Sequence, residues 1–199
     1  EVPELGVEVF AAKQAGAGVI DGRSRFDYAA GHIPGSIGIE LGDSFAPWAG
    51  WLFEFNQPLL LVLNEDQDAS EAAVELARIG FTTIEGVLRG IEGWRESDRE
   101  LAAYETATAA QLAGHLAGDW GGQILDVRDP LEWASGHIDG SAHRYLPDLR
   151  DGLAGTVNMG EPVWVICRTG NRSSIAAGLL EGLGVEPIVV ATGGVPDVI

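Results

Sequence analysis

The sequence is poor in the residues that build metal sites and crosslinks. Cys167 is the only cysteine, and four histidines are scattered along 199 residues. A single cysteine excludes an internal disulfide and is typical of the reducing cytoplasm, where we expect this protein. Four scattered histidines and one cysteine give no ligand spacing for a metal ion, so we expect no metal site.

Long apolar runs are also missing. The segment 59–63, LLLVL, is typical of the apolar runs that occur, and a membrane-spanning helix needs roughly 18 apolar residues. No basic segment followed by an apolar one opens the sequence, so no signal peptide is visible. The chain starts with Glu1 rather than methionine, which predicts a processed or excised piece of a longer chain.

Positive charge is scarce. The 12 lysines and arginines face 30 aspartates and glutamates, which gives a net charge of −18. A chain this acidic repels nucleic acid and anionic lipid, so we expect neither as a partner and no membrane association. An anionic substrate would need a local positive site that works against the global field, so clusters of arginine are informative.

The chain repeats itself. Residues 19–41 align without gaps with residues 124–146, with 9 identities in 23 positions, and 58–81 then align with 162–185. The sequence therefore predicts two copies of one domain, over 1–100 and 101–199, with a short polar linker within 96–106.

Each copy has the pattern of an α/β domain. Short apolar runs that end in charge are typical of buried parallel strands, and helical apolar spacing that ends at glycine predicts helices. Strands that alternate with helices favour a small parallel sheet flanked by helices. Thr108 and Gln111 resemble a capping box. The expected strands are 19–23, 58–63 and 82–87 with 124–128, 162–167 and 186–192, and the expected helices are 70–80 and 173–184.

The segment 167–174, CRTGNRSS, joins the end of an expected strand to an expected helix start at Ser173 and Ser174. Loops at this place bind ligands in parallel sheets, and the helix N-terminus favours an anion. Gly170 can adopt a positive φ, which lets the backbone curl into a cradle. Helix N-termini and neighbouring arginines favour a thiolate. We interpret Cys167 as a nucleophile rather than a small core residue, the usual role of a free cysteine.

The first copy serves as an internal control. It has Leu63 in place of Cys167, and its loop 64–68, NEDQD, carries three carboxylates where the second copy has two arginines. Features that both copies share should serve the fold, and features of the second copy alone are candidates for chemistry. This test predicts structural roles for His32 and His137.

The same comparison sorts other residues. Asp126 and Arg128 recur in the first copy and are expected to belong to the scaffold. His143 and Arg144 occur only in the second copy; they could assist the site or form a solvated surface pair. The aromatic segment 45–55, expected in a loop, could pack between the domains or dock a partner domain.

At this point the residues resemble a known family. DVRDPLEWASGHIDGS (126–141), CRTGNRS (167–173) and TGG (192–194) are similar to the rhodanese domain, a sulfurtransferase fold. The first copy keeps IDGRSRFDYAAGHIPGS (20–36) without the loop and resembles an inactive rhodanese domain. SFAPWAGWL (44–52) resembles tandem rhodanese regions fused behind a metallo-β-lactamase-like domain in bacteria, and a chain that starts at Glu1 would suit the excised C-terminal part of such a fusion.

The resemblance implies a mechanism and a set of site residues. Cys167 would take the outer sulfur of thiosulfate or another sulfane donor as a persulfide and pass it to a thiophilic acceptor such as cyanide or a thiol. Arg168 and Arg172 would steer the anion, and no cofactor is implied. The partner would be a small sulfur-containing anion or a low-molecular-weight thiol persulfide. The residues that would bind the substrate are Arg168, Thr169, Gly170, Asn171, Arg172 and Ser173.

Two other functions are open. The second copy could be a non-catalytic sulfur-carrying or regulatory module for a fused or partner domain. A related cysteine-dependent phosphatase would have five residues between its cysteine and arginine, whereas only four separate Cys167 from Arg172. The chain ends soon after Gly194, which predicts a shortened last helix that affects the stability of the second copy rather than its site.

Overall fold

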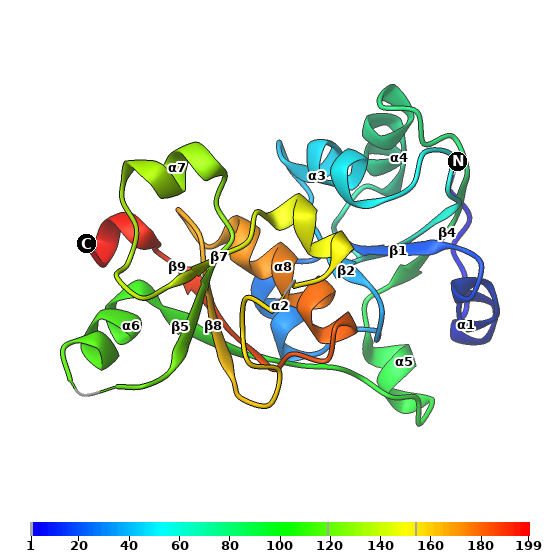
Figure 1. Ribbon diagram of the computed structural model, residues 1–199. Helices are drawn as coiled ribbons and strands as arrows, with labels where there is room; N and C mark the ends of the chain where they lie inside the picture. The colour runs from blue at the N-terminus through cyan, green and yellow to red at the C-terminus, as the bar shows by residue number, and fades with distance from the viewer. Residues whose placement is uncertain (1, 119, 154) are drawn as a thin grey trace. The chain divides into compact units, whose positions relative to one another are not determined.

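The computed structural model describes residues 2–118, 120–153 and 155–199. The chain divides into two compact units, Glu1–Ala103 and Tyr104–Ile199, whose elements are labelled in Figure 1. The segment expected as linker ends inside a strand of the second unit, because β5 begins at Glu105. Within the described ranges, no helix combines the length and the apolar character that crossing a bilayer requires.

The first unit is built on a parallel sheet of four strands in the order β2-β1-β3-β4. Its central strand β3 is buried along its whole length. The strands are β1 (Gly18–Asp21), β2 (Ile37–Gly38), β3 (Leu59–Leu63) and β4 (Ile84–Arg89), and the helices are α1 (Val7–Gln14), α2 (Arg25–Ala30), α3 (Phe45–Leu52), α4 (Ala69–Arg78) and α5 (Glu92–Glu96).

The second unit has a parallel sheet of five strands in the order β5-β9-β8-β6-β7. The strands are β5 (Glu105–Thr108), β6 (Gln123–Asp126), β7 (Ala142–His143), β8 (Val163–Ile166) and β9 (Pro187–Thr192). The helices are α6 (Ala109–Leu116), α7 (Pro130–Ser135) and α8 (Asn171–Gly182), with 3₁₀ turns η1 (Leu146–Asp151) and η2 (Val195–Asp197).

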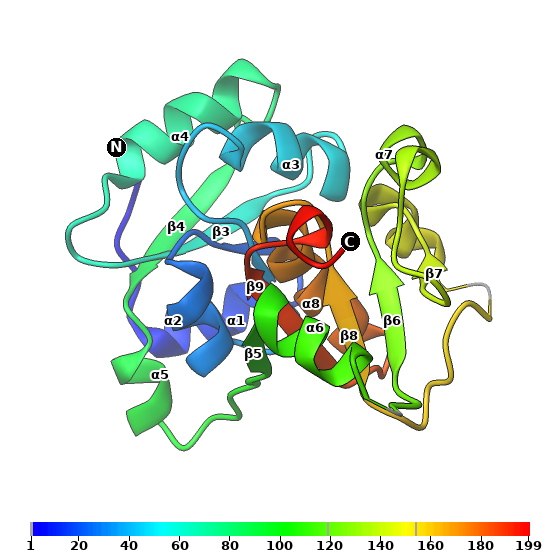
Figure 2. The ribbon, with the colours of Figure 1, turned by 90° about the vertical axis from the view of Figure 1, so that its left-hand side faces the viewer.

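Helices cover both faces of the second sheet, as the alternation of strands and helices predicts. Successive side chains of a strand point to opposite faces. Val190 of β9 accordingly packs in one cluster with Leu112 of α6, and its neighbour Val189 packs with Ala177 of α8. Both helices can be followed in Figure 2. The predicted fold class is therefore confirmed.

Two interactions recur in both units and support the scaffold interpretation of the repeated residues. The Arg128 guanidinium donates to the Asp126 carboxylate (Nε–Oδ2, 2.8 Å) and to the carbonyl oxygen of Gly136 (2.8 Å). Arg23 donates in the same way to Asp21 and to Gly31. These four side chains are buried, so each pair joins the end of a strand to the turn after the following helix.

The repeated histidines have structural partners, as the comparison of the two copies predicts. Nδ1 of His32 donates to the carbonyl oxygen of Tyr28 (2.8 Å), and Nδ1 of His137 donates to that of Trp133 (3.1 Å). Each imidazole also stacks on the ring four residues earlier, with ring centroids 3.8 and 3.7 Å apart. Both histidines therefore stabilise the C-terminal end of the helix that precedes them.

The segment 45–55 differs from the expected loop, because its first eight residues form α3. Phe45, Ala49 and Leu52 are buried at helical spacing, so one apolar face drives the helix. Two other aromatic residues of the segment, Trp51 within α3 and Phe55 after it, are 58% and 74% exposed. The two alternatives for this segment, packing between domains and partner docking, stay predictions.

Candidate active site

Cys167 directly follows β8, which lies between β9 and β6 in the middle of the second sheet. Its side chain is only 1% exposed. The sulfur lies 3.5 Å from Oγ of Ser173, in the first turn of α8. The thiol therefore points into the loop and toward the helix N-terminus, as the sequence predicts.

The helix starts earlier than predicted. α8 begins at Asn171, two residues before Ser173, so only Arg168, Thr169 and Gly170 separate Cys167 from the helix. The reason is the backbone of Gly170, which is left-handed with φ 88° and ψ −15°, a conformation that glycine adopts without steric cost. The left-handed backbone of Gly170 turns the chain from the end of β8 into α8 within the three residues Arg168, Thr169 and Gly170.

Among the residues that the structure describes, no side chain caps the start of α8. The first N–H groups of a helix lack partners within the helix and carry the positive end of its dipole. In α8 the first turn contains Ser173, whose Oγ lies 3.5 Å from the sulfur of Cys167 and donates to the carbonyl oxygens of Gly170 and Val190 (3.1 and 2.8 Å). The helix start is therefore available to an anion bound at the sulfur.

The turn after β9 contacts the backbone of the Cys167 loop. The backbone N–H of Val195 donates to the carbonyl oxygen of Cys167 (2.9 Å), and a Cβ atom on Gly194 would overlap the carbonyl oxygen of Arg168. Asp197 fixes this turn by accepting from the N–H of Gly194 (2.8 Å). The backbone of this turn therefore contacts the loop of the candidate nucleophile. The effect of a shortened last helix on the stability of the second copy stays a prediction.

The two arginines of the loop have different surroundings. Arg172 donates through Nη1 and Nη2 to both carboxylate oxygens of Glu132 in α7, with Nη2–Oε1 at 2.9 Å. Arg168 is exposed, and within the described part of the chain its side chain makes no hydrogen bond or ion pair. The sequence interpretation gave both arginines the same steering role, but the structure leaves only Arg168 unengaged.

Charged neighbours shift the pKa values of Arg172 and Asp129 beside the thiol. The pKa of the Arg172 guanidinium is raised, mainly because Glu132 accepts its hydrogen bonds and also because of its electrostatic interaction with Cys167. The pKa of Asp129 is lowered, mainly by hydrogen bonds with the side chain and the backbone N–H of Glu132. Arg172 thus remains a fixed positive charge near the sulfur. Sequence comparison missed Glu132, since its counterpart in the first copy, Asp27, is acidic too.

His143 and Arg144, the residues found only in the second copy, both have structural partners. His143 stacks on Trp133 with centroids 4.8 Å apart, and its Nε2 donates to the carbonyl oxygen of Arg128 (2.7 Å). Arg144 donates from Nη2 to the carbonyl oxygen of Asp148 (2.7 Å). Their assistance to the site stays a prediction.

The first unit occupies the corresponding helix start with its own carboxylate. Asp68 caps α4 by accepting from the N–H groups of Ser70 and Glu71 (2.8 and 3.3 Å). A negative side chain thus holds the place that an anion could take at α8. Leu63 ends the strand that corresponds to β8, so this unit has neither the nucleophile nor the open helix start.

Side chains of the first unit also fill its loop. Gln67 donates to the carbonyl oxygen of Gly22 (2.7 Å) and accepts from the N–H of Asn64 (2.8 Å). Arg89, at the end of β4, donates to the carbonyl oxygens of Asn64 and Gln67 (3.1 and 2.8 Å). The loop 64–68 is therefore closed by internal hydrogen bonds rather than shaped as an anion cradle.

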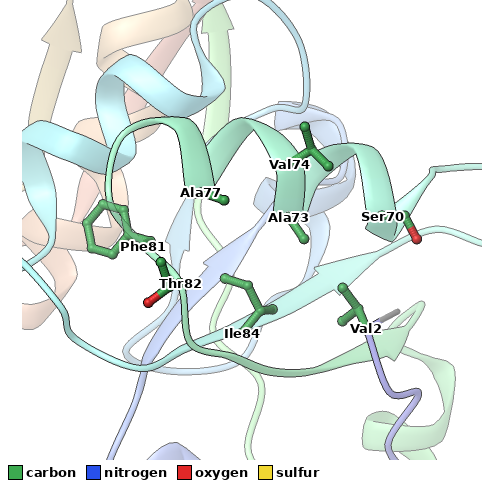
Figure 3. Close-up of a pocket in the computed structure, with 8 residues that line it drawn as sticks. All are labelled: Val2, Ser70, Ala73, Val74, Ala77, Phe81, Thr82 and Ile84. Atoms are coloured by element: carbon green, nitrogen blue, oxygen red, sulfur yellow. The ribbon is translucent and has the colours of Figure 1, made fainter.

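A hollow of about 330 Å³ lies elsewhere in the first unit, between α4 and the start of β4 (Figure 3). Ala73 and Ala77 of the helix face Ile84 across it, and Val2 closes one end. The residues around it are Val2, Ser70, Ala73, Val74, Ala77, Phe81, Thr82 and Ile84. None of these side chains titrates near neutral pH, so thiol or acid–base chemistry has no group to use there.

Comparison with known proteins identifies relatives of the chain. The thiosulfate sulfurtransferase GlpE of Stutzerimonas stutzeri (strain A1501) is 35% identical over 80 residues, which are 40% of this chain and 72% of that protein. The thiosulfate sulfurtransferase GlpE of Pseudomonas putida (strain GB-1) is 35% identical over 74 residues, which are 37% of this chain and 66% of that protein. The match thus spans just under two thirds of the Pseudomonas putida relative.

Solved structures include a rhodanese-like domain protein from Staphylococcus aureus. It is 28% identical with a TM-score of 0.41, over 45% of this chain and 86% of that chain. A thiosulfate sulfurtransferase from Pseudomonas aeruginosa is 20% identical with a TM-score of 0.38, over 94% of this chain and 42% of that chain.

The family model of the rhodanese-like domain matches the chain twice, over residues 7–97 and 108–198. One match lies in each compact unit, and together they cover most of the sequence. The chain therefore belongs to the rhodanese-like domain family and carries two of its domains in tandem.

Proposed function

We propose that the second unit is a sulfurtransferase that moves a sulfane sulfur from thiosulfate or a persulfide donor to a thiophilic acceptor through a Cys167 persulfide. One observation carries the proposal: the Cys167 sulfur lies against the uncapped start of α8. The first unit supports it by contrast, because it has Leu63 and a helix start capped by Asp68.

The reaction has two displacements at sulfur. The Cys167 thiolate attacks the outer sulfur of thiosulfate, a new S–S bond forms, and sulfite leaves with the electron pair of the bond that breaks. The acceptor then attacks the terminal sulfur of the persulfide. With cyanide, thiocyanate forms and the Cys167 thiolate is regenerated, so no net oxidant or reductant is consumed.

The loop would bind both the donor and the persulfide. Backbone N–H groups from Arg168 to Ser173 would stabilise a negative charge that builds up on a terminal sulfur, which the 3.5 Å distance from the Cys167 sulfur to Ser173 Oγ supports. Arg168 is exposed next to Cys167 and would attract the anionic donor. The first unit has no counterpart of this site and would serve a structural or partner-binding role.

A sulfur-carrying module without turnover is the main alternative. Such a module would form the persulfide but release it only to a fused or partner domain, and a metallo-β-lactamase-like domain stays a prediction for that role. The phosphatase alternative has less support, because only three residues precede the helix and the cradle is small.

Thiosulfate incubation followed by intact-mass measurement tests the proposal. We expect the wild type to gain one sulfur atom, which a reductant removes, and Cys167→Ala to gain none while its circular dichroism is unchanged. Cys167→Ser keeps the size of the side chain and should also fail. Thiocyanate production from thiosulfate and cyanide then separates the alternatives. A wild type without an adduct contradicts both sulfur functions, whereas an adduct that neither cyanide nor thiols remove favours the carrier.

A further inference from the structure

We infer that Glu132 determines donor specificity, because it pairs with Arg172 and thereby keeps this guanidinium from binding the substrate. On this view the site favours sulfur donors with one negative charge near the transferred sulfur over donors with two, such as thiosulfate. The inference rests on the proposed function, since it concerns the donor that reacts with Cys167. Nothing in the sequence motif distinguishes Arg172 from Arg168, so the distinction comes from the structure.

The first step is the geometry of the ion pair. Arg172 is the second residue of α8, and Glu132 is the third residue of α7. Both carboxylate oxygens accept from the guanidinium, and the two side chains are 17% and 19% exposed. Bidentate pairs of this kind are among the strongest hydrogen-bonded contacts of arginine. Two N–H groups of the Arg172 guanidinium are therefore already engaged by Glu132, and its charge is paired.

The second step is that Glu132 is itself held in place. α7 opens with a capping box, in which Asp129 accepts from the N–H groups of Leu131 and Glu132 (2.8 and 3.0 Å). The Glu132 carboxylate in turn accepts from the N–H of Asp129 (3.4 Å). If Arg172 turned toward a donor, this fixed and largely buried carboxylate would lose its partner, which is costly.

The third step is the balance of charge. Arg168 and Arg172 bring two positive charges to the loop, and Glu132 and Asp129 place two negative charges beside Arg172, with Asp129 Oδ2 at 4.0 Å from Nη1. Only Arg168 is left to match a bound anion. A second negative charge on the donor then meets no second unpaired arginine in the described loop, and it is repelled by the two carboxylates.

The test compares two donors that differ by one charge, thiosulfate and methanethiosulfonate, with cyanide as acceptor. Glu132→Gln removes the negative charge but keeps the size of the side chain and its place in the capping box. We expect the ratio of kcat/KM for thiosulfate to kcat/KM for methanethiosulfonate to rise about tenfold, the order of one charge interaction in a partly buried site. The rise should come mainly from a lower KM for thiosulfate, and it should become smaller at high salt.

Two control variants make the result specific. Glu186→Gln makes the same charge change at an exposed position just before β9, at the opposite end of the sheet, and should leave the ratio unchanged. Glu132→Asp keeps the charge and should stay close to the wild-type ratio. An unchanged ratio in Glu132→Gln, an equal loss of kcat with both donors, or the same shift in Glu186→Gln would overturn the inference. A wild type that forms no persulfide with either donor would instead refute the proposed function.

Discussion

A Cβ atom added to Gly170 would overlap the carbonyl oxygen of Ala191. The backbone of the Cys167 loop thus rests directly on β9, without a side chain between them. The left-handed conformation of Gly170 lets this contact form and also starts α8 at Asn171, four residues after Cys167. One glycine therefore sets both the depth of the loop and the position of the helix N-terminus.

Gly170→Ala should remove sulfur transfer and destabilise the second unit. Both the positive φ and the overlap with Ala191 act against the side chain, and together we expect a cost of about 2–4 kcal/mol. Gly140→Ala is the matched control, because Gly140 also has a positive φ (79°) but has open space around it. It should cost roughly 1 kcal/mol and leave transfer intact. Thermal unfolding and thiocyanate production measure both; equal losses of activity in the two variants would contradict the role of the contact.

Local sequence patterns predicted the framework of this site well. Apolar runs located the central strands, and Thr108 and Gln111 form the predicted capping box. These features depend on neighbours within a few residues, which a sequence shows directly. The start of α8 was misplaced by two residues, because it depends on how Gly170 meets Ala191, some 20 positions further along the chain.

The partner of Arg172 could not be predicted for the same physical reason. Glu132 lies 40 residues earlier, and only the packing of α7 beside the loop brings the two together. The comparison of copies carried a weak signal, because Arg172 aligns with Asp68 and Glu132 with Asp27. Two carboxylates at these positions would repel, so the pair is confined to the second copy, but the sequence gives no distance.

Arg128→Met should strongly destabilise the second unit. Arg128 and Asp126 form a buried ion pair, and removal of one partner leaves an uncompensated carboxylate, at a cost of about 3–5 kcal/mol. The double variant Asp126→Leu/Arg128→Met should lose less, because no unpaired charge remains. Urea unfolding followed by tryptophan fluorescence measures both. If the single variant loses less than about 1 kcal/mol, the pair behaves like an exposed one and its scaffold role is wrong.

Replacing residues 63–69 by the sequence CRTGNRS tests whether the first unit lacks only its loop. In a Cys167→Ala background, we expect this graft alone to take up no sulfur from thiosulfate. Arg89 donates to the loop carbonyls of Asn64 and Gln67, whereas the aligned residue of the second unit is Gly193. Its guanidinium would still hold the grafted backbone in the closed form, so adding Arg89→Gly should allow a persulfide. Intact mass measures both variants. Sulfur uptake by the graft alone would show that Arg89 does not close the loop, and failure of the combined variant would show that the first unit has lost more than these residues.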